Sequence, residues 1–266
     1  MSSKSVSCLL YGGLGNQLFQ IFATIAYALE HNREYWFEYS SSLGKRPTYW
    51  HNLLAELQPH LHRSEDCKSN GISSLMQLEE SHIHESHNDV QCIILNGYFQ
   101  CPAYFDKWYN KIIDICKLHI KCQYNNTVSM HFRRGDYKAI PECHPIIGTD
   151  YYIKALDYVC TLDPSINTVQ YYCEDDDHAD IVLVINDLLL LFPSLVFKRF
   201  KGITDYEEML AMAGCKHNII ANSSFSWWGA YLNPFSEKIV CYPATWFGPM
   251  ISKSVDSMFP ASWTKI

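Results

Sequence analysis

From Thr127 to Tyr242, predicted strands and predicted helices alternate along the chain. This alternation constrains the fold more than any other feature, because it is typical of a parallel sheet whose strands are joined by right-handed helical crossovers. We therefore expect an α/β fold in this half of the chain. The predicted strands are 127–134, 168–174, 195–200, 217–221 and 238–242, and the predicted helices lie near 149–162, 178–192, 204–215 and 225–232.

The N-terminal half opens with an apolar strand at 6–10, a glycine-rich loop at 11–17 and a helix at 17–31. Exposed amides at a helix N-terminus, beside glycines, favour an anion. The loop is neither a P-loop nor a complete dinucleotide fingerprint, so a purely structural turn is the alternative. Further predicted elements are strands at 34–39 and 92–95 and helices near 52–57, 73–80 and 103–121.

A polar segment at 123–126 separates the two halves and predicts domains at 1–122 and 123–266. With 266 residues, of which 48% are hydrophobic, the chain can bury one large core or two modest ones. A net charge of −7 argues against a nucleic-acid-binding surface. No apolar run of about 18 residues is present, so we expect no transmembrane segment.

Metal and disulfide chemistry receive little support from the sequence. The eleven cysteines show no CxxC signature, which indicates free thiols in a reducing, cytoplasmic setting. His82, His84, Glu85 and His87 lie close together but lack the HExxH spacing, and they favour a solvated loop over a metal site.

The stretch 127–137 reads TVSMHFRRGDY. Alternation at period two places His131 and Arg133 on one face of a strand that ends at Gly135. Arg133 and Arg134 then lie near the carboxyl end of the strand, where open α/β sheets bind their ligands. A guanidinium bonds two oxygens at once and stays charged, which suits a diphosphate. Pairing of these arginines with surface carboxylates is the alternative.

Two later strand ends carry polar residues toward the same edge. Residues 174–177 are Glu-Asp-Asp-Asp, and a carboxylate there can accept both N1–H and the exocyclic amine of guanine. The alternative is an acidic helix N-terminus. Residues 222–228 read NSSFSWW, whose hydroxyl residues are good helix caps and whose amides can bind a phosphate. Trp227 and Trp228 fit packing better than sugar stacking.

Taken together, these motifs resemble the α-1,2-fucosyltransferase family, glycosyltransferase family 11, from Tyr11 to about Trp246. The similar segments are GGLGNQLFQ at 12–20, GYFQ at 97–100 followed by Tyr104 and Phe105, HFRRGDY at 131–137 and NSSFSWW at 222–228. The chain departs from the family at Glu174, since the usual pattern is Ser-Asp-Asp. The membrane anchor of animal members is also absent, as in soluble microbial or viral relatives.

The resemblance implies a GT-B-like fold, with two Rossmann-like halves facing a cleft and the C-terminal half binding the nucleotide sugar. It also implies a metal-independent, inverting transfer of L-fucose from GDP-fucose to the 2-hydroxyl of a terminal galactose, with no cofactor. Arg133 would contact the phosphate, with Arg134 as a supporting residue. Asp136 would act as the general base or would orient Arg133. The implied donor-binding residues are Gly13, Gly15, Asn16, Gln17, His131, Arg133, Arg134, Asp175, Asp176, Asn222, Ser223 and Ser224.

The identity of the acceptor is the part of the function that the sequence constrains least. Aromatic residues in the first 120 positions supply surface for sugar faces, namely Phe37, Tyr39, Tyr49, Trp50, Tyr98 and Phe99. Another acceptor sugar or linkage, or a non-catalytic GDP-sugar- or glycan-binding module, stays open. A Rossmann-type dehydrogenase is disfavoured, because the loop at 12–15 is not GxGxxG.

Overall fold

The computed structural model describes residues 4–62, 74–84 and 87–266. The chain divides into two compact units, Met1–His119 and Ile120–Ile266. The division lies close to the boundary predicted after residue 122. No helix in the described parts of the chain is long and apolar enough to cross a membrane.

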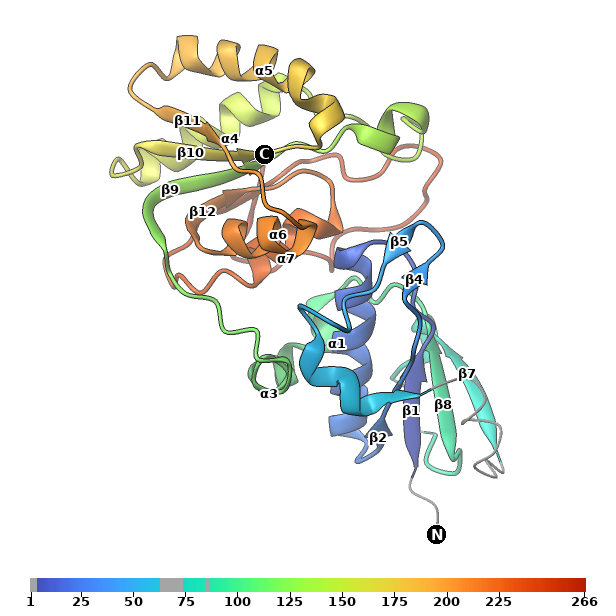
Figure 1. The fold of residues 1–266 in the computed structure, drawn as a ribbon. Helices are drawn as coiled ribbons and strands as arrows, with labels where there is room; N and C mark the ends of the chain where they lie inside the picture. The colour runs from blue at the N-terminus through green and yellow to red at the C-terminus, as the bar shows by residue number, and fades with distance from the viewer. Residues whose placement is uncertain (1–3, 63–73, 85–86) are drawn as a thin grey trace. The chain divides into compact units, whose positions relative to one another are not determined.

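The second unit is built on a six-stranded sheet in the order β11-β10-β9-β12-β13-β14, and every pairing is parallel (Figure 1). Numbered from β9 in chain order, this is the 3-2-1-4-5-6 arrangement of a doubly wound Rossmann-type sheet. The predicted parallel sheet is therefore confirmed, with one short strand more than expected. The strands are β9 Tyr124–His131, β10 Thr168–Tyr172, β11 Val196–Arg199, β12 Cys215–Ile219, β13 Val240–Tyr242 and β14 Thr264–Lys265.

The four α-helices of this unit, α4 to α7, cover the sheet (Figure 1). The helices α4 and α5 lie on one face, and α6 and α7 lie on the other. The chain thus changes face between β11 and β12, as the strand order requires. Their bounds are α4 Thr149–Leu162, α5 His178–Leu191, α6 Asp205–Ala213 and α7 Ser224–Tyr231, close to the helices predicted from sequence.

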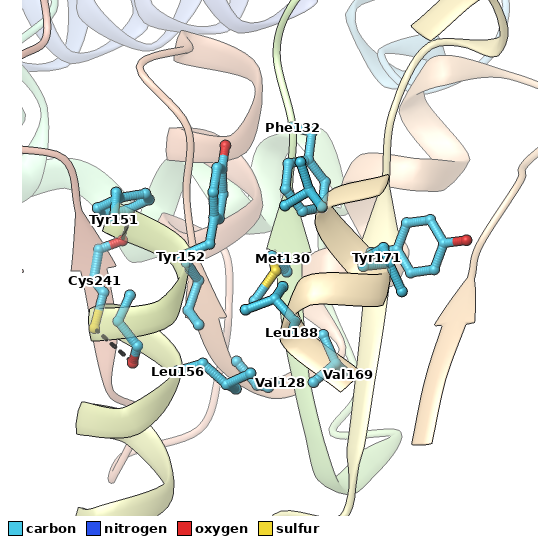
Figure 2. Close-up of a cluster of buried hydrophobic side chains, with 14 of the residues drawn as sticks. Val128, Met130, Phe132, Tyr151, Tyr152, Leu156, Val169, Tyr171, Leu188 and Cys241 are labelled. Atoms are coloured by element: carbon cyan, nitrogen blue, oxygen red, sulfur yellow. Dashed lines mark hydrogen bonds between the residues drawn. The ribbon is translucent and has the colours of Figure 1, made fainter. Parts of the chain in front are cut away.

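The central strand β9 divides its side chains between the two faces. Val128 and Met130 of β9, and Phe132 directly after it, are buried in the apolar cluster that β9 and β10 form with α4 and α5 (Figure 2). Ser129 faces the other way, and its hydroxyl accepts a hydrogen bond from Asn218 at 2.7 Å. Each large apolar side chain buried in this way contributes about 1.5–3 kcal/mol. Because this packing fixes the strand, it also fixes where the chain leaves the sheet.

The first unit has a four-stranded parallel sheet in the order β2-β1-β8-β7, with the long helix α1 Leu14–Glu30 after β1. Its strands are β1 Ser5–Cys8, β2 Glu34–Tyr35, β7 Leu75–Glu79 and β8 Cys92–Asn96. Smaller elements are the pair β3 Phe37–Glu38 and β6 Leu61–His62, the hairpin β4 Ser42–Leu43 and β5 Arg46–Pro47, the helix α3 Tyr109–Cys116, and 3-10 turns at Ala55–His60, Glu80–His82, Pro102–Tyr104 and Asp106–Trp108.

Two predicted helices in this unit are wrong. In the segment predicted as helix 73–80, residues Leu75–Glu79 form strand β7, which pairs in parallel with β8 from Leu75 opposite Cys92. Its apolar residues fit either period, so the available partner strand decides. The predicted helix 103–121 is broken into two 3-10 turns and α3, which ends where Lys117 adopts φ 52° in the left-handed region.

Candidate functional site

The sheet of the second unit has its topological switch point between β9 and β12. These strands are neighbours, with Met130 beside Ile219, yet the chain leaves them toward helices on opposite faces. In open α/β sheets, ligands bind beyond the carboxyl ends of the strands at such a point. The HFRRGDY motif spans the last residue of β9 and the segment that follows from 132, and the NSSFSWW motif lies in the segment that leaves β12 at 220.

Arg133 lies just past the end of β9 and is held by two carboxylates. Its Nη1 pairs with Glu174 and its Nη2 pairs with Asp136. The guanidinium also lies over the ring of Tyr137, 5.1 Å from the ring centroid. The Arg133 side chain is 17% exposed, whereas both carboxylates are about half exposed. The cation is therefore oriented by its neighbours and still reaches solvent.

The turn after Arg133 is anchored by a buried carboxylate. Asp177, whose side chain is 3% exposed, accepts a hydrogen bond from the Gly135 amide at 2.6 Å and pairs with Lys138 at 2.7 Å. Burial alone would raise the pKa of Asp177, but the bonds from Lys138 and Gly135 outweigh it and hold the pKa below its usual value. Arg134 lies 3.9 Å from Asp180, which also pairs with Lys138.

His131, the last residue of β9, is a buried neutral imidazole. Burial, followed by the neighbouring charge of Arg133, lowers its pKa to about 3. The ring lies 5.5 Å from that of Phe225. Within the described residues, its Nδ1 has no hydrogen-bond partner. The side chain is thus buried at the strand end with one polar atom unsatisfied.

The acidic residues after β10 lie beside β11. Asp175 pairs with Arg199 at 2.6 Å and with Lys201 at 2.7 Å. Lys201 and then Arg199 lower the pKa of Asp175, so it stays ionised. Asp176 is exposed. These residues do precede α5, as the helix-terminus interpretation requires, but Asp177, at the helix cap, makes no side-chain hydrogen bond to the helix amides.

The NSSFSWW motif begins α7. Asn222 is buried and donates hydrogen bonds to the carbonyls of Pro145 at 2.9 Å and Trp246 at 3.2 Å, so its side chain ties two loops together. Ser223 caps α7 by accepting from the Phe225 amide at 3.3 Å. Ser224 is the first helical residue. Trp227 and Trp228 are both fully buried, so their predicted packing role is confirmed.

The glycine-rich loop belongs to the first unit. Gly12 has φ +84°, and an added Cβ would lie 2.6 Å from the Asn16 amide nitrogen, so the turn requires glycine. Gln17 is buried and donates to the carbonyls of Gly12 and Pro47 at 3.1 and 2.9 Å. The Asn16 side chain accepts from Gln100 at 3.0 Å.

The bond between Asn16 and Gln100 joins the GGLGNQLFQ motif to the GYFQ motif. The side chains of Gln17 and Asn16 thus stabilise the local structure of this unit. Gly13 and Gly15 lie at the cap and in the first turn of α1, and Gly13 has open space where a Cβ would lie. The expectation that the four residues Gly13, Gly15, Asn16 and Gln17 contact a donor stays a prediction.

Among the residues that the structure describes, no three His, Cys, Asp or Glu side chains are placed to hold a metal ion. Glu85, one member of the histidine-rich group considered in the sequence, lies outside those residues.

The structure brings Arg133, Arg134, Asp136 and His131 together at the end of β9. Sequence reasoning did not anticipate the roles of Glu174, Asp177, Arg199 and Lys201. For Glu174 and Asp177 the signal was the acidic run after a strand, but this run becomes informative only once β9 and β10 are known to be adjacent.

Of the aromatic residues expected to face acceptor sugars, only Tyr39 and Tyr98 are exposed, at 40% and 41%. The prediction is wrong for four others, because their rings are in the core of the first unit: Phe37, Tyr49, Trp50 and Phe99 are 0–2% exposed.

Two proteins of Escherichia coli are similar to this chain in sequence. An O-antigen biosynthesis glycosyltransferase, WbnK, is 31% identical over 201 residues, which cover 64% of this chain and 62% of the relative. An alpha-1,2-colitosyltransferase is 30% identical over 183 residues and is covered over 61% of its length. The chain thus spans about three fifths of the length of these relatives.

Solved structures of similar fold include a mutant of Arabidopsis thaliana FUT1 in complex with GDP, with a TM-score of 0.55 at 10% identity over 91% of this chain and 70% of that chain. Another is Escherichia coli ADP-heptose LPS heptosyltransferase II, with a TM-score of 0.51 at 10% identity over 99% of this chain and 90% of that chain. Together with the parallel sheets, these likenesses confirm the α/β, GT-B-like fold class.

The family model described as Glycosyl transferase family 11 matches residues 104–266, well over half of the chain. The matched region holds the HFRRGDY and NSSFSWW motifs and the switch point between β9 and β12. The resemblance seen in the sequence is therefore confirmed, and the chain belongs to glycosyltransferase family 11.

Proposed function

We propose that this chain transfers L-fucose from GDP-fucose to the 2-hydroxyl of a terminal galactoside, with inversion at the anomeric carbon and without a metal or other cofactor. The single observation that carries the proposal is the position of Arg133. It is an oriented, partly exposed guanidinium beside the switch point of a Rossmann-type sheet, in a family 11 chain.

The chemistry requires a cation at the leaving group. When the bond between fucose and GDP breaks, negative charge develops on the β-phosphate oxygen. A preorganised donor aimed at that charge lowers the barrier without reorganising during the reaction. Arg133 is suited to this work because Asp136 and the Tyr137 ring already hold its guanidinium. Arg134 adds positive charge beside it.

The start of α7 supplies a second group of donors. The N-terminal amides of a helix favour phosphate, and Ser223 and Ser224 lie at this end of α7. Ser223 already caps the helix through its hydroxyl oxygen, but its O–H is still able to donate to a phosphate oxygen. Asn222 supports this end of α7, because its buried side-chain amide donates to the carbonyls of Pro145 and Trp246 and so fixes the neighbouring loops.

We assign guanine recognition to the residues at the neighbouring strand ends. Asp175 is kept ionised by Lys201 and Arg199, and an ionised carboxylate can accept both N–H groups on one edge of guanine. Exposed Asp176 is the other candidate. His131, neutral and with an unsatisfied Nδ1 among the described residues, can contribute one hydrogen bond to the nucleotide.

Asp136 pairs with Arg133, which favours an orienting role over that of general base. In an inverting transfer the acceptor hydroxyl attacks the face opposite the leaving group, where the sugar carries oxocarbenium character. Exposed Tyr39 and Tyr98 on the first unit are the aromatic surfaces proposed for acceptor sugars. A cytoplasmic setting is proposed on the cysteine pattern alone.

A second donor deserves a test, because one relative is named an alpha-1,2-colitosyltransferase. Colitose is L-fucose without its 3-hydroxyl. A GDP-linked colitose would share the nucleotide half of the proposed donor and would differ from GDP-fucose in a single hydroxyl of the sugar.

The test is to incubate the chain with GDP-fucose or GDP-colitose and with lactose or N-acetyllactosamine, and to read the new linkage by two-dimensional NMR. An α-linked fucose at position 2 of galactose is the expected product. Preference for GDP-colitose would replace GDP-fucose as the assigned donor. A linkage at another position would overturn the assignment of the galactose 2-hydroxyl as acceptor. Binding of GDP-fucose with neither transfer nor hydrolysis would identify a non-catalytic module.

A further inference from the structure

Glu174 forms an ion pair with Arg133, which lies just past the end of β9. The last strand residue of β10 is Tyr172, and Glu174 follows it by two positions, so its side chain reaches across to the end of neighbouring β9. There its Oε1 pairs with Nη1 of Arg133. The function proposed above requires the same guanidinium to bind a phosphate oxygen of the donor.

The turn after β9 is shaped to admit this carboxylate. Gly135 has φ +24°, and a Cβ added to it would collide with the Glu174 carboxylate. Any other residue at this position would therefore move Glu174 or the turn. Glycine at 135 thus serves the approach of Glu174 as well as the backbone conformation.

Two carboxylates of the same acidic run behave differently. Asp177 is 3% exposed and bonds to the backbone of the turn, so it can leave only if the turn moves. Glu174 is 48% exposed and bonds to a side chain, so it can rotate into solvent without opening a cavity. Asp177 is a fixed anchor, and Glu174 is an exchangeable partner.

We propose that Glu174 competes with the diphosphate of the donor for Arg133 and so weakens nucleotide binding. This inference rests on the proposed function and adds a residue that sets donor affinity. A carboxylate and a phosphate oxygen accept from the same N–H groups, and they repel each other because both are negative. The diphosphate binds when Glu174 releases Nη1, while Asp136 retains Nη2.

The competition requires a negative charge at position 174. Serine is usual at position 174 in the family that the sequence resembles, and its side chain is shorter and uncharged. A serine there could neither neutralise Arg133 nor repel a phosphate.

The experiment measures binding of GDP, inorganic pyrophosphate and guanosine by calorimetry at low and high salt. The proteins are the wild type, Glu174→Gln, Glu174→Ser and Glu237→Gln. Glu237 is the matched control, because it is exposed on the segment before β13, at the opposite end of the parallel strands. Circular dichroism confirms that each variant is folded.

Both Glu174 variants should bind GDP and pyrophosphate about two- to fivefold more tightly than the wild type, the range expected for loss of a half-exposed ion pair. Guanosine should bind equally to all four proteins, and Glu237→Gln should match the wild type. The gain should shrink at high salt, which screens exposed charges.

Unchanged or weaker binding of both anions by the two Glu174 variants would overturn the proposal. Tighter pyrophosphate binding by the variants, with no GDP binding by any protein, would support the role of Glu174 and contradict the GDP donor. The pyrophosphate and GDP measurements thus separate the failure of this inference from the failure of the proposed function.

Discussion

The backbone amide of Gly135 donates a hydrogen bond to the buried carboxylate of Asp177 at 2.6 Å. One residue is in the turn after β9, and the other lies immediately before α5. The bond therefore holds the turn that carries Arg133 against an element that is itself packed on the sheet. The position of the functional cation depends on this anchor.

Asp177→Ala should destabilise the fold and misplace Arg133. The change leaves the Gly135 amide without its acceptor in a partly buried place and removes a partner of Lys138. We expect the free energy of unfolding to fall by about 1.5–3 kcal/mol, as for a hydrogen bond to a charged group. Urea denaturation measures it. Asp180→Ala is the control, since Asp180 is half exposed and pairs with the same lysine; equal losses in the two variants would show that the Gly135 contact is unimportant.

Much of the second unit could be predicted, because α4 and α5 show clear helical spacing and β9 shows clear alternation. The side-chain contacts at the candidate site could not be predicted. Glu174 and Arg133 meet only because β10 lies beside β9, and strand order depends on how the helices pack rather than on any local pattern. In β7, apolar residues fit both periods, so pairing with β8 decides. Asn222 stays a predicted donor-binding residue, and the two hydrogen bonds from its side-chain amide to the carbonyls of Pro145 and Trp246 could not be foreseen from the motif.

His131 should make stability depend on pH in the acid range. Its pKa is about 3 in the folded protein, below the ordinary value of about 6.5. Between these values the unfolded chain binds a proton that the folded chain does not. The contribution of neutral His131 to the free energy of unfolding should therefore be fully present above about pH 6.5. It should decrease as the pH falls toward 3, by up to about 1.4 kcal/mol per pH unit. Urea titrations at several pH values should show a shallower slope in His131→Asn; parallel slopes would contradict the assignment.

Substitutions of Ser223 should separate its two roles. As a cap for α7, Ser223→Ala should cost about 1 kcal/mol of unfolding free energy, and Ser223→Gly only a few tenths. If the hydroxyl also contacts the pyrophosphate, the glycine variant should keep its stability and yet bind GDP more weakly. Thermal unfolding and GDP titration on the same samples measure both. Unchanged GDP affinity in Ser223→Gly would leave this residue as a cap alone.

Transfer should survive chelation. In the proposed reaction Arg133 and the N-terminus of α7 stabilise the leaving group, so removal of divalent ions should leave turnover unchanged within error. The assay compares dialysed protein with and without EDTA. A strong loss that Mn²⁺ or Mg²⁺ restores would assign the chain a metal-dependent mechanism instead.

The central claim is that Arg133 stabilises the departing diphosphate, and the turnover of Arg133→Ala with GDP-fucose and a β-galactoside acceptor tests it most directly. Arg133 is partly exposed beyond the end of β9, so its truncation should leave the fold intact, as circular dichroism can verify. Losing a preorganised donor to a developing negative charge should lower turnover by about 100-fold or more. A folded Arg133→Ala variant that keeps more than about a tenth of wild-type turnover would contradict the account.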